Sequence, residues 1–192
     1  GASNPVVGLD GWVNGTDEVR GMQAFFQRYG IQVRTDFDPL NEIWTDRPSI
    51  PTAKVELHPL EFAGETTESK FARIRESLRS RGAEAMLVSA LDDIAWTLNL
   101  RGSDVYCNPV FVSYLMIEQE SATLFVNEEK LDDAVRRYLS DLGVAVQPYA
   151  AVADYLRSHA FEGGLLLDSV KTCYYLASCA LEKSVVRFAP SP

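Results

Sequence analysis

Histidine is scarce in this sequence, where His58 and His159 are the only two among 192 residues. Hydrolysis by a bound metal needs several His, Asp or Glu side chains that converge on an open coordination position. His58 lies beside Pro59 and His159 follows an expected helix, and neither has a partner histidine at the spacing of about three to five residues that is typical of zinc sites. We expect both histidines to be structural or solvated, and no metal site in this chain.

The sequence also has few basic residues and no long apolar run. There are 18 Lys and Arg residues against 27 Asp and Glu residues, which gives a net charge of -9. Phosphate backbones are bound by clustered Lys and Arg, so nucleic acid is not an expected partner. The longest apolar run, over residues 110–117, is far shorter than the roughly 20 residues of a membrane span. The sequence therefore predicts no membrane partner, and its first residues lack the basic and apolar stretches of a secretion signal.

Cysteine is limited to Cys107, Cys173 and Cys179, which cannot all pair. Disulfides are not expected, and a reducing cytoplasm is the simplest location. A catalytic thiol or hydroxyl needs a base within reach. The sequence has no Gly-x-Ser-x-Gly motif and no histidine near Cys107, so nucleophilic catalysis is not expected either.

The opening segment predicts a strand, a helix and a second strand. The helix is expected to start at Thr16 or Asp17 and to end at Gly30, between strands over residues 6–9 and 31–34. The residues expected to bury one face of this helix are Val19, Met22, Phe26 and Tyr29. Prolines over residues 48–59 then predict an extended connector between two folding units.

From Thr66 onward, helices and strands alternate. The strongest helical stripe has apolar residues at offsets 0, 3, 4, 7, 8 and 11 from Leu131 and ends at Gly143. The other predicted helices span residues 66–82, 92–99, 152–156 and 173–181, and the predicted strands span residues 85–89, 110–117, 122–126, 144–147, 165–167 and 185–188. A turn is expected at residues 101–103, and the strands over 110–117 and 122–126 should form a hairpin. This order predicts an α/β domain with a mixed β-sheet flanked by helices.

Acidic residues gather at two expected helix starts, Asp92-Asp93 and Asp132-Asp133. Carboxylates at these positions cap backbone amides and are stabilised by the helix dipole. Asp168 ends an expected strand, where a turn-forming role is the commoner one. We interpret all of them as structural.

One segment closely resembles a known family. Residues 90–104, Ala-Leu-Asp-Asp-Ile-Ala-Trp-Thr-Leu-Asn-Leu-Arg-Gly-Ser-Asp, and Asn-Pro-Val-Phe at 108–111 resemble the signature of the second domain of three-domain Xaa-Pro aminopeptidases. Residues 43–48 and 60–64 are similar to the connector between the first two domains of that family. The resemblance implies a creatinase-type amino-terminal domain of ribonuclease-H-like topology. It places the closing part of a first domain plus connector at residues 1–62, and a second domain at 63–192.

The resemblance also implies a function for the parent protein. In this family a catalytic domain of the pita-bread fold binds two divalent ions, often manganese, and hydrolyses the bond before a penultimate proline. Its ligands, two Asp, one His and two Glu, cannot be placed on any residue here. We therefore expect a non-catalytic region with no cofactor of its own, which packs on its own catalytic domain and forms one wall of the substrate cleft. Peptide substrate would be reached through that domain, and a homodimer is a further expected partner.

Arg101, Asn99 and Asp104 are the candidate cleft residues that the resemblance implies. Arg101 follows a short apolar helix, so its guanidinium could project from a turn and hold a peptide carbonyl or carboxylate through two parallel hydrogen bonds. The alternative is a surface arginine at a helix end. A free-standing binding module is the alternative for the whole chain. A ribonuclease-H-like nuclease is disfavoured, because function belongs to a site and the acidic chain lacks basic patches.

Overall fold

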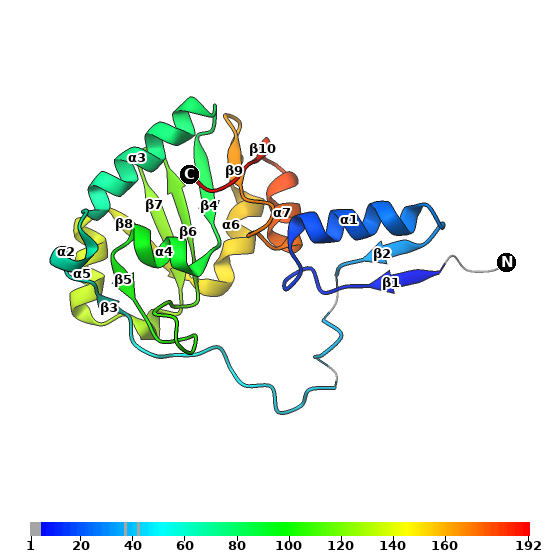
Figure 1. Cartoon of the computed structure of the whole chain (residues 1–192), viewed down its shortest axis with the longest axis horizontal. Coiled ribbons are helices and arrows are strands. Elements are labelled where there is room, and N and C mark those ends of the chain that lie inside the picture. The colour runs from blue at the N-terminus through cyan, green and yellow to red at the C-terminus, as the bar shows by residue number, and fades with distance from the viewer. Residues whose placement is uncertain (1–4, 37, 42) are drawn as a thin grey trace.

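The computed structural model describes residues 5–36, 38–41 and 43–192. Most of the chain builds a six-stranded mixed sheet in the order β10-β9-β4-β6-β7-β8 (Figure 1). The strands are β4 (Ala85–Val88), β6 (Ser113–Glu118), β7 (Ala122–Val126), β8 (Val144–Pro148), β9 (Leu165–Leu167) and β10 (Val186–Phe188). The β4–β6 and β6–β7 pairs are antiparallel, and the β4–β9, β9–β10 and β7–β8 pairs are parallel. The predicted mixed sheet and the predicted hairpin are thus confirmed.

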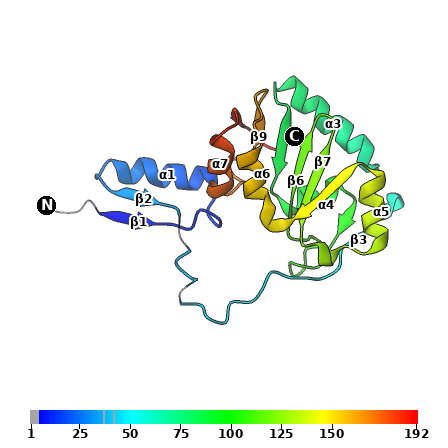
Figure 2. The ribbon, with the colours of Figure 1, turned by 180° about the vertical axis from the view of Figure 1, so that it is seen from behind.

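Helices cover both faces of this sheet and bury two separate cores. The helices are α3 (Thr67–Ser80), α4 (Leu91–Thr97) and α5 (Asp133–Asp141) on one face, and α6 (Val152–Ser158) and α7 (Tyr174–Leu181) on the other (Figure 2). Successive side chains of a strand point to opposite faces, so Met86 and Val88 join the first core while Ala85 and Leu87 join the second. Because both faces are covered, the central strands β4 and β9 are continuous, buried apolar runs.

Helix α5 shows how local sequence sets an element's bounds. The Asp132 carboxylate accepts a hydrogen bond from the backbone N–H of Val135 at 2.8 Å, which caps the helix two residues after the predicted start. Leu131 precedes the helix but stays buried beside Leu139 in the same core. Gly143 ends the helix with a φ of 69°, a conformation that glycine adopts without steric cost.

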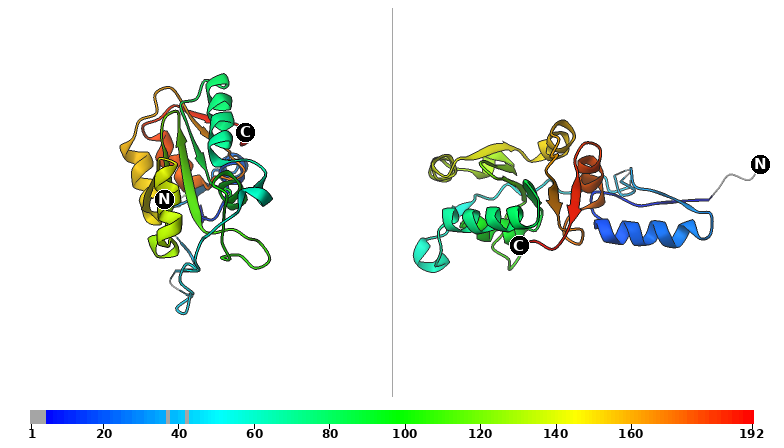
Figure 3. Two further views of the ribbon diagram at one scale, coloured as in Figure 1. Left: turned by 90° about the vertical axis from the view of Figure 1, so that its left-hand side faces the viewer. Right: turned by 90° about the horizontal axis from the view of Figure 1, so that it is seen from above.

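The opening unit consists of β1 (Val6–Gly8), α1 (Thr16–Gln27) and β2 (Gln32–Arg34), with β1 parallel to β2. The predicted order of strand, helix and strand is confirmed. On the predicted α1 face, Val19 is buried and Met22 and Phe26 are half-buried, but the predicted burial of Tyr29 is wrong. Tyr29 is 66% exposed, because α1 packs on β2 and contacts α7, while its far end projects away from the central sheet (Figure 3). The start of α1 is fixed there by the buried Thr16 hydroxyl, which donates to the Thr172 carbonyl at 2.7 Å.

The predicted connector over residues 48–59 is largely extended and crosses the lower side of the molecule in Figure 1. It contains the short strand β3 (Glu56–Leu57) and leads into α2 (Leu60–Ala63). β3 pairs antiparallel with β5 (Leu100–Arg101), so Arg101 lies in a strand and not in the predicted turn. The backbone around Arg101 instead finds hydrogen-bond partners in a connector that is distant in sequence.

The packing of the segment after β5 can be tested at Gly102. A Cβ at this position would lie 2.7 Å from the Phe111 Cβ and 2.9 Å from the Val110 carbonyl oxygen. We expect Gly102→Ala to lower the free energy of unfolding by about 1–3 kcal/mol, measured by urea denaturation. Gly21→Ala is the matched control, because nothing lies within 4 Å of its new Cβ and alanine favours the α1 helix by about 0.5–1 kcal/mol. Equal stability of the two variants would contradict this packing.

Candidate functional site

Arg101 is held by backbone carbonyls at the edge of a small surface hollow. Its Nη1 donates to the carbonyl oxygens of Ala95 and Leu100, each at 2.8 Å. Among the described residues, its Nε and Nη2 donate no hydrogen bond. The hollow has a volume of about 140 Å³ and is lined by Asp92, Ala95, Trp96, Arg101, Asn108, Pro109 and Val110. Part of the guanidinium fork is therefore open to a ligand that accepts hydrogen bonds.

Asn99 points into the protein. Its Oδ1 accepts a hydrogen bond from the Lys70 ammonium at 2.6 Å, and its Nδ2 donates to the Glu65 carbonyl at 2.8 Å. Its own carbonyl accepts from the backbone N–H of His58 at 2.8 Å. Its φ is 49°, which asparagine tolerates better than most residues. Asn99 thus joins α3, the connector and the end of α4 beneath the Arg101 strand.

Asp104 is also internal, and its side chain is completely buried. Its Oδ2 pairs with the Lys130 ammonium and accepts a hydrogen bond from the backbone N–H of Val112 at 2.6 Å. Oδ1 has no hydrogen-bond donor among the described residues. The structure therefore places the three candidates within one short segment, but only Arg101 lines the hollow.

Lys70 and Lys130 are the partners that sequence reasoning missed. Both side chains are buried, which is rare for lysine. Burial lowers the pKa of Lys70, the Glu65 carboxylate raises it, and the charges of Arg101 and Arg73 lower it further. The available signal for Lys70 was its position on α3, where it falls in the same helical stripe as the buried apolar residues; Lys130 follows two glutamates and carried no such signal.

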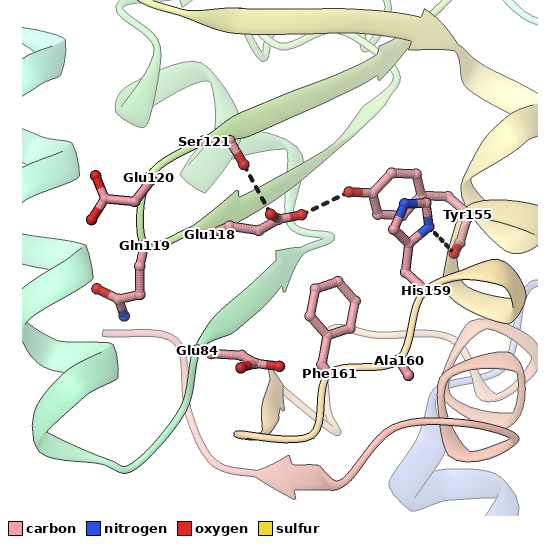
Figure 4. A pocket seen from close by; sticks show the side chains of 9 residues that line it. All are labelled: Glu84, Glu118, Gln119, Glu120, Ser121, Tyr155, His159, Ala160 and Phe161. Carbon is pink, nitrogen blue, oxygen red and sulfur yellow. Dashed lines mark hydrogen bonds between the residues drawn. The ribbon is translucent and has the colours of Figure 1, made fainter.

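A larger hollow of about 530 Å³ lies at the opposite end of the sheet, next to the β6–β7 turn (Figure 4). There the Tyr155 hydroxyl donates to Glu118 Oε1 at 2.7 Å and the Ser121 hydroxyl donates to Glu118 Oε2 at 2.9 Å. The His159 ring stacks on Tyr155 with centroids 3.8 Å apart. Burial raises the pKa of the Tyr155 phenol, and Glu118 raises it further. Two hydroxyl groups thus occupy the Glu118 carboxylate, and the Tyr155 phenol stays protonated. Neither side chain is free to act as a general base toward a ligand in this hollow.

The remaining candidate residues have structural surroundings. Within residues 5–36, 38–41 and 43–192, no group of three or more His, Cys, Asp or Glu side chains could hold a metal ion. Asp168 accepts hydrogen bonds from the backbone N–H groups of Val170 and Ser191, which confirms its turn-forming role. Burial raises the pKa of the Cys173 and Cys179 thiols, so neither is an activated nucleophile. In the same described part of the chain, no helix combines the length and the apolar character that crossing a membrane requires.

Known proteins resemble this chain in sequence and in structure. The model of the Creatinase/Prolidase N-terminal domain family matches residues 46–192. The chain is 36% identical over 182 residues to Xaa-Pro aminopeptidase 1 of Dictyostelium discoideum, covering 90% of this chain and 29% of that protein. It is 35% identical over 147 residues to aminopeptidase P1 of Arabidopsis thaliana, covering 76% of this chain and 23% of that protein.

A solved structure extends the similarity to the fold. The crystal structure of X-prolyl aminopeptidase from Caenorhabditis elegans, described as a cytosolic enzyme with a di-nuclear active site, matches with a TM-score of 0.87 and 27% identity. The match covers 98% of this chain and 32% of that one. The chain thus spans less than a third of the length of these relatives.

The internal role of Lys70 gives a direct stability test. Lys70→Met removes the ammonium that donates to Asn99 Oδ1 and to the Trp96 carbonyl. The Trp96 carbonyl keeps the Asn99 N–H as a donor, but the buried Asn99 Oδ1 loses the lysine donor. We expect the free energy of unfolding to fall by about 2 kcal/mol, measured by urea denaturation. The control Lys183→Met changes an exposed lysine and should stay within about 0.5 kcal/mol of the parent chain. A Lys70→Met curve that overlays the parent curve would contradict this account.

Proposed function

Since the chain belongs to the Creatinase/Prolidase N-terminal domain family, we propose that it is the non-catalytic amino-terminal region of an Xaa-Pro aminopeptidase. Such an enzyme removes the first residue of a peptide whose second residue is proline. The names of the sequence relatives and of the solved neighbour support this activity for the parent protein. In this proposal residues 1–62 are the closing part of a first domain plus the connector, and residues 63–192 are the second domain.

The proposed partner of this region is the catalytic domain of the same protein. The surface around Arg101 supports this contact, because it combines an open guanidinium fork with the exposed apolar side chain of Trp96. Pro192 lies beside Trp96 and lines two small hollows with it. A second copy of the whole protein is a further proposed partner.

The single observation that carries the proposal for the site is the fixed geometry of Arg101. Two carbonyls hold Nη1, while Nε and Nη2 donate no hydrogen bond among the described residues. An arginine fork that is held in this way can donate two parallel hydrogen bonds to a peptide carbonyl or carboxylate at low entropic cost. We propose that Arg101 orients the peptide at one wall of the cleft, while the buried side chains of Asn99 and Asp104 hold the strand that carries it.

The bond cleavage itself is assigned to the catalytic domain. Two divalent ions, manganese in this proposal, would activate water and polarise the peptide carbonyl there. The residues of this chain do not fit such a site, because the described part holds no converging set of ligands. A cytoplasmic location is proposed from the three free thiols and from the description of the nematode enzyme as cytosolic.

Arg101→Ala tests the proposed site in the longer protein that carries this region. We expect kcat/KM for Xaa-Pro peptides to fall about tenfold or more, which corresponds to roughly 1.4 kcal/mol of transition-state binding, while the thermal midpoint stays nearly unchanged. Arg101→Lys should recover only part of the activity, because an ammonium cannot donate as a planar fork. Arg28→Ala, at the exposed end of α1, is the control and should keep parental kinetics. If Arg101→Ala also keeps parental kinetics, Arg101 is structural.

Metal analysis tests the assignment of the metal site. After dialysis, residues 1–192 alone should retain less than about one tenth of an equivalent of manganese or zinc, because no described cluster has the ligands that such ions need. The same chain should not cleave Xaa-Pro peptides. One tightly held equivalent of metal, or measurable turnover, would contradict the non-catalytic role.

A further inference from the structure

The Lys130–Asp104 pair is the most deeply buried ion pair among the described residues, with both side chains 0% exposed. Neither side chain can reach a peptide at the surface. Taking two charges out of water is costly, and such pairs add little net stability over apolar residues of similar size. A gain in folding stability therefore does not explain why a charged pair lies here. The role of the pair is indicated by the segments that it joins.

Asp104 closes the loop that follows the Arg101 strand. Its carboxylate accepts from the backbone N–H of Val112, and its own N–H donates to the Val110 carbonyl at 3.1 Å. Gly102 donates its N–H to the Pro109 carbonyl at 3.3 Å on the same loop. These contacts close the base of the loop over residues 102–112. The position of Asp104 therefore sets the position of the end of β5.

Lys130 also holds β3, the strand that pairs with β5. Its backbone carbonyl accepts from the N–H of Val55 at 2.9 Å, directly before β3. β3 in turn pairs with β5, with Glu56 opposite Arg101. One residue thus anchors, through its backbone, the strand beside Arg101 and, through its ammonium, the loop after Arg101.

We infer that the Lys130–Asp104 pair is a positioning pair for Arg101: the ion pair fixes β5 against β3 and thereby sets where the guanidinium fork points. The inference rests on the proposed role of Arg101 in orienting the peptide. Lys130 acts only through this geometry and contacts neither peptide nor metal. Loss of the ammonium frees the loop end of β5, and the open fork of Arg101 then spreads over many orientations.

A double-mutant cycle in the longer protein tests this inference. Lys130→Met should lower kcat/KM for an Xaa-Pro peptide about tenfold when Arg101 is present, and less than about twofold in the Arg101→Ala background. Amide hydrogen exchange of residues 54–58 and 99–104 should become faster in Lys130→Met without any substrate. Glu128→Gln is the matched control, because it opens an exposed ion pair with Arg136 in the same segment and should change neither readout.

The variant Lys130→Met with Asp104→Asn keeps the test valid if the single variant folds poorly, because it leaves no lone buried charge. It should show the same dependence on Arg101. Equal losses with and without Arg101 would overturn the positioning role and leave the proposed function intact. Parental kinetics of Lys130→Met, with Arg101→Ala impaired, would do the same. If Arg101→Ala alone keeps parental kinetics, the proposed role of Arg101 fails and this inference fails with it.

Discussion

A lysine ammonium can leave water only where oxygen atoms replace its hydration. Two buried lysines of this chain find such oxygen atoms in the short segment around Arg101. Lys70 donates to Asn99 Oδ1 and to the Trp96 carbonyl, and Lys130 pairs with Asp104. These contacts fix residues 99 and 104, which flank the Arg101 strand on either side. The strand has only two residues and one short partner strand, so its position depends on these buried charges more than on its own backbone pairing.

The two ends of the central sheet consequently differ in what they present. The end that follows β4 carries α4 and Arg101, with exposed apolar side chains and Pro192 beside it. The other end carries Glu118 and Tyr155, whose polar atoms are already joined to each other. Only the first end combines an open cationic fork with apolar surface, which is the combination that suits contact with a peptide and a neighbouring domain. In the proposed division of labour, this region supplies a fixed wall and the catalytic domain supplies the metal chemistry.

Local sequence was sufficient for most of the fold. Helix α5 and the β6–β7 hairpin were predictable because apolar periodicity, a capping carboxylate and a terminal glycine all act within a few residues. The β3–β5 pair was not, since each strand has two residues and the partners are far apart in sequence. Arg101 was found by resemblance to a family motif. Its supports, Lys70 and Lys130, were missed because lysine is almost never fully buried, and only the contacts of the folded chain show why it is here.

In the proposed function, the surface around Arg101 lines the substrate cleft of the longer protein. Photo-crosslinking tests this placement with an Xaa-Pro peptide that carries a photoreactive group beyond its proline, followed by mass spectrometry of the labelled segments. We expect labelling within residues 92–110 that unmodified peptide competes away and that Arg101→Ala reduces. Labelling confined to the catalytic domain, or found at the Glu118 end of this region, would contradict it.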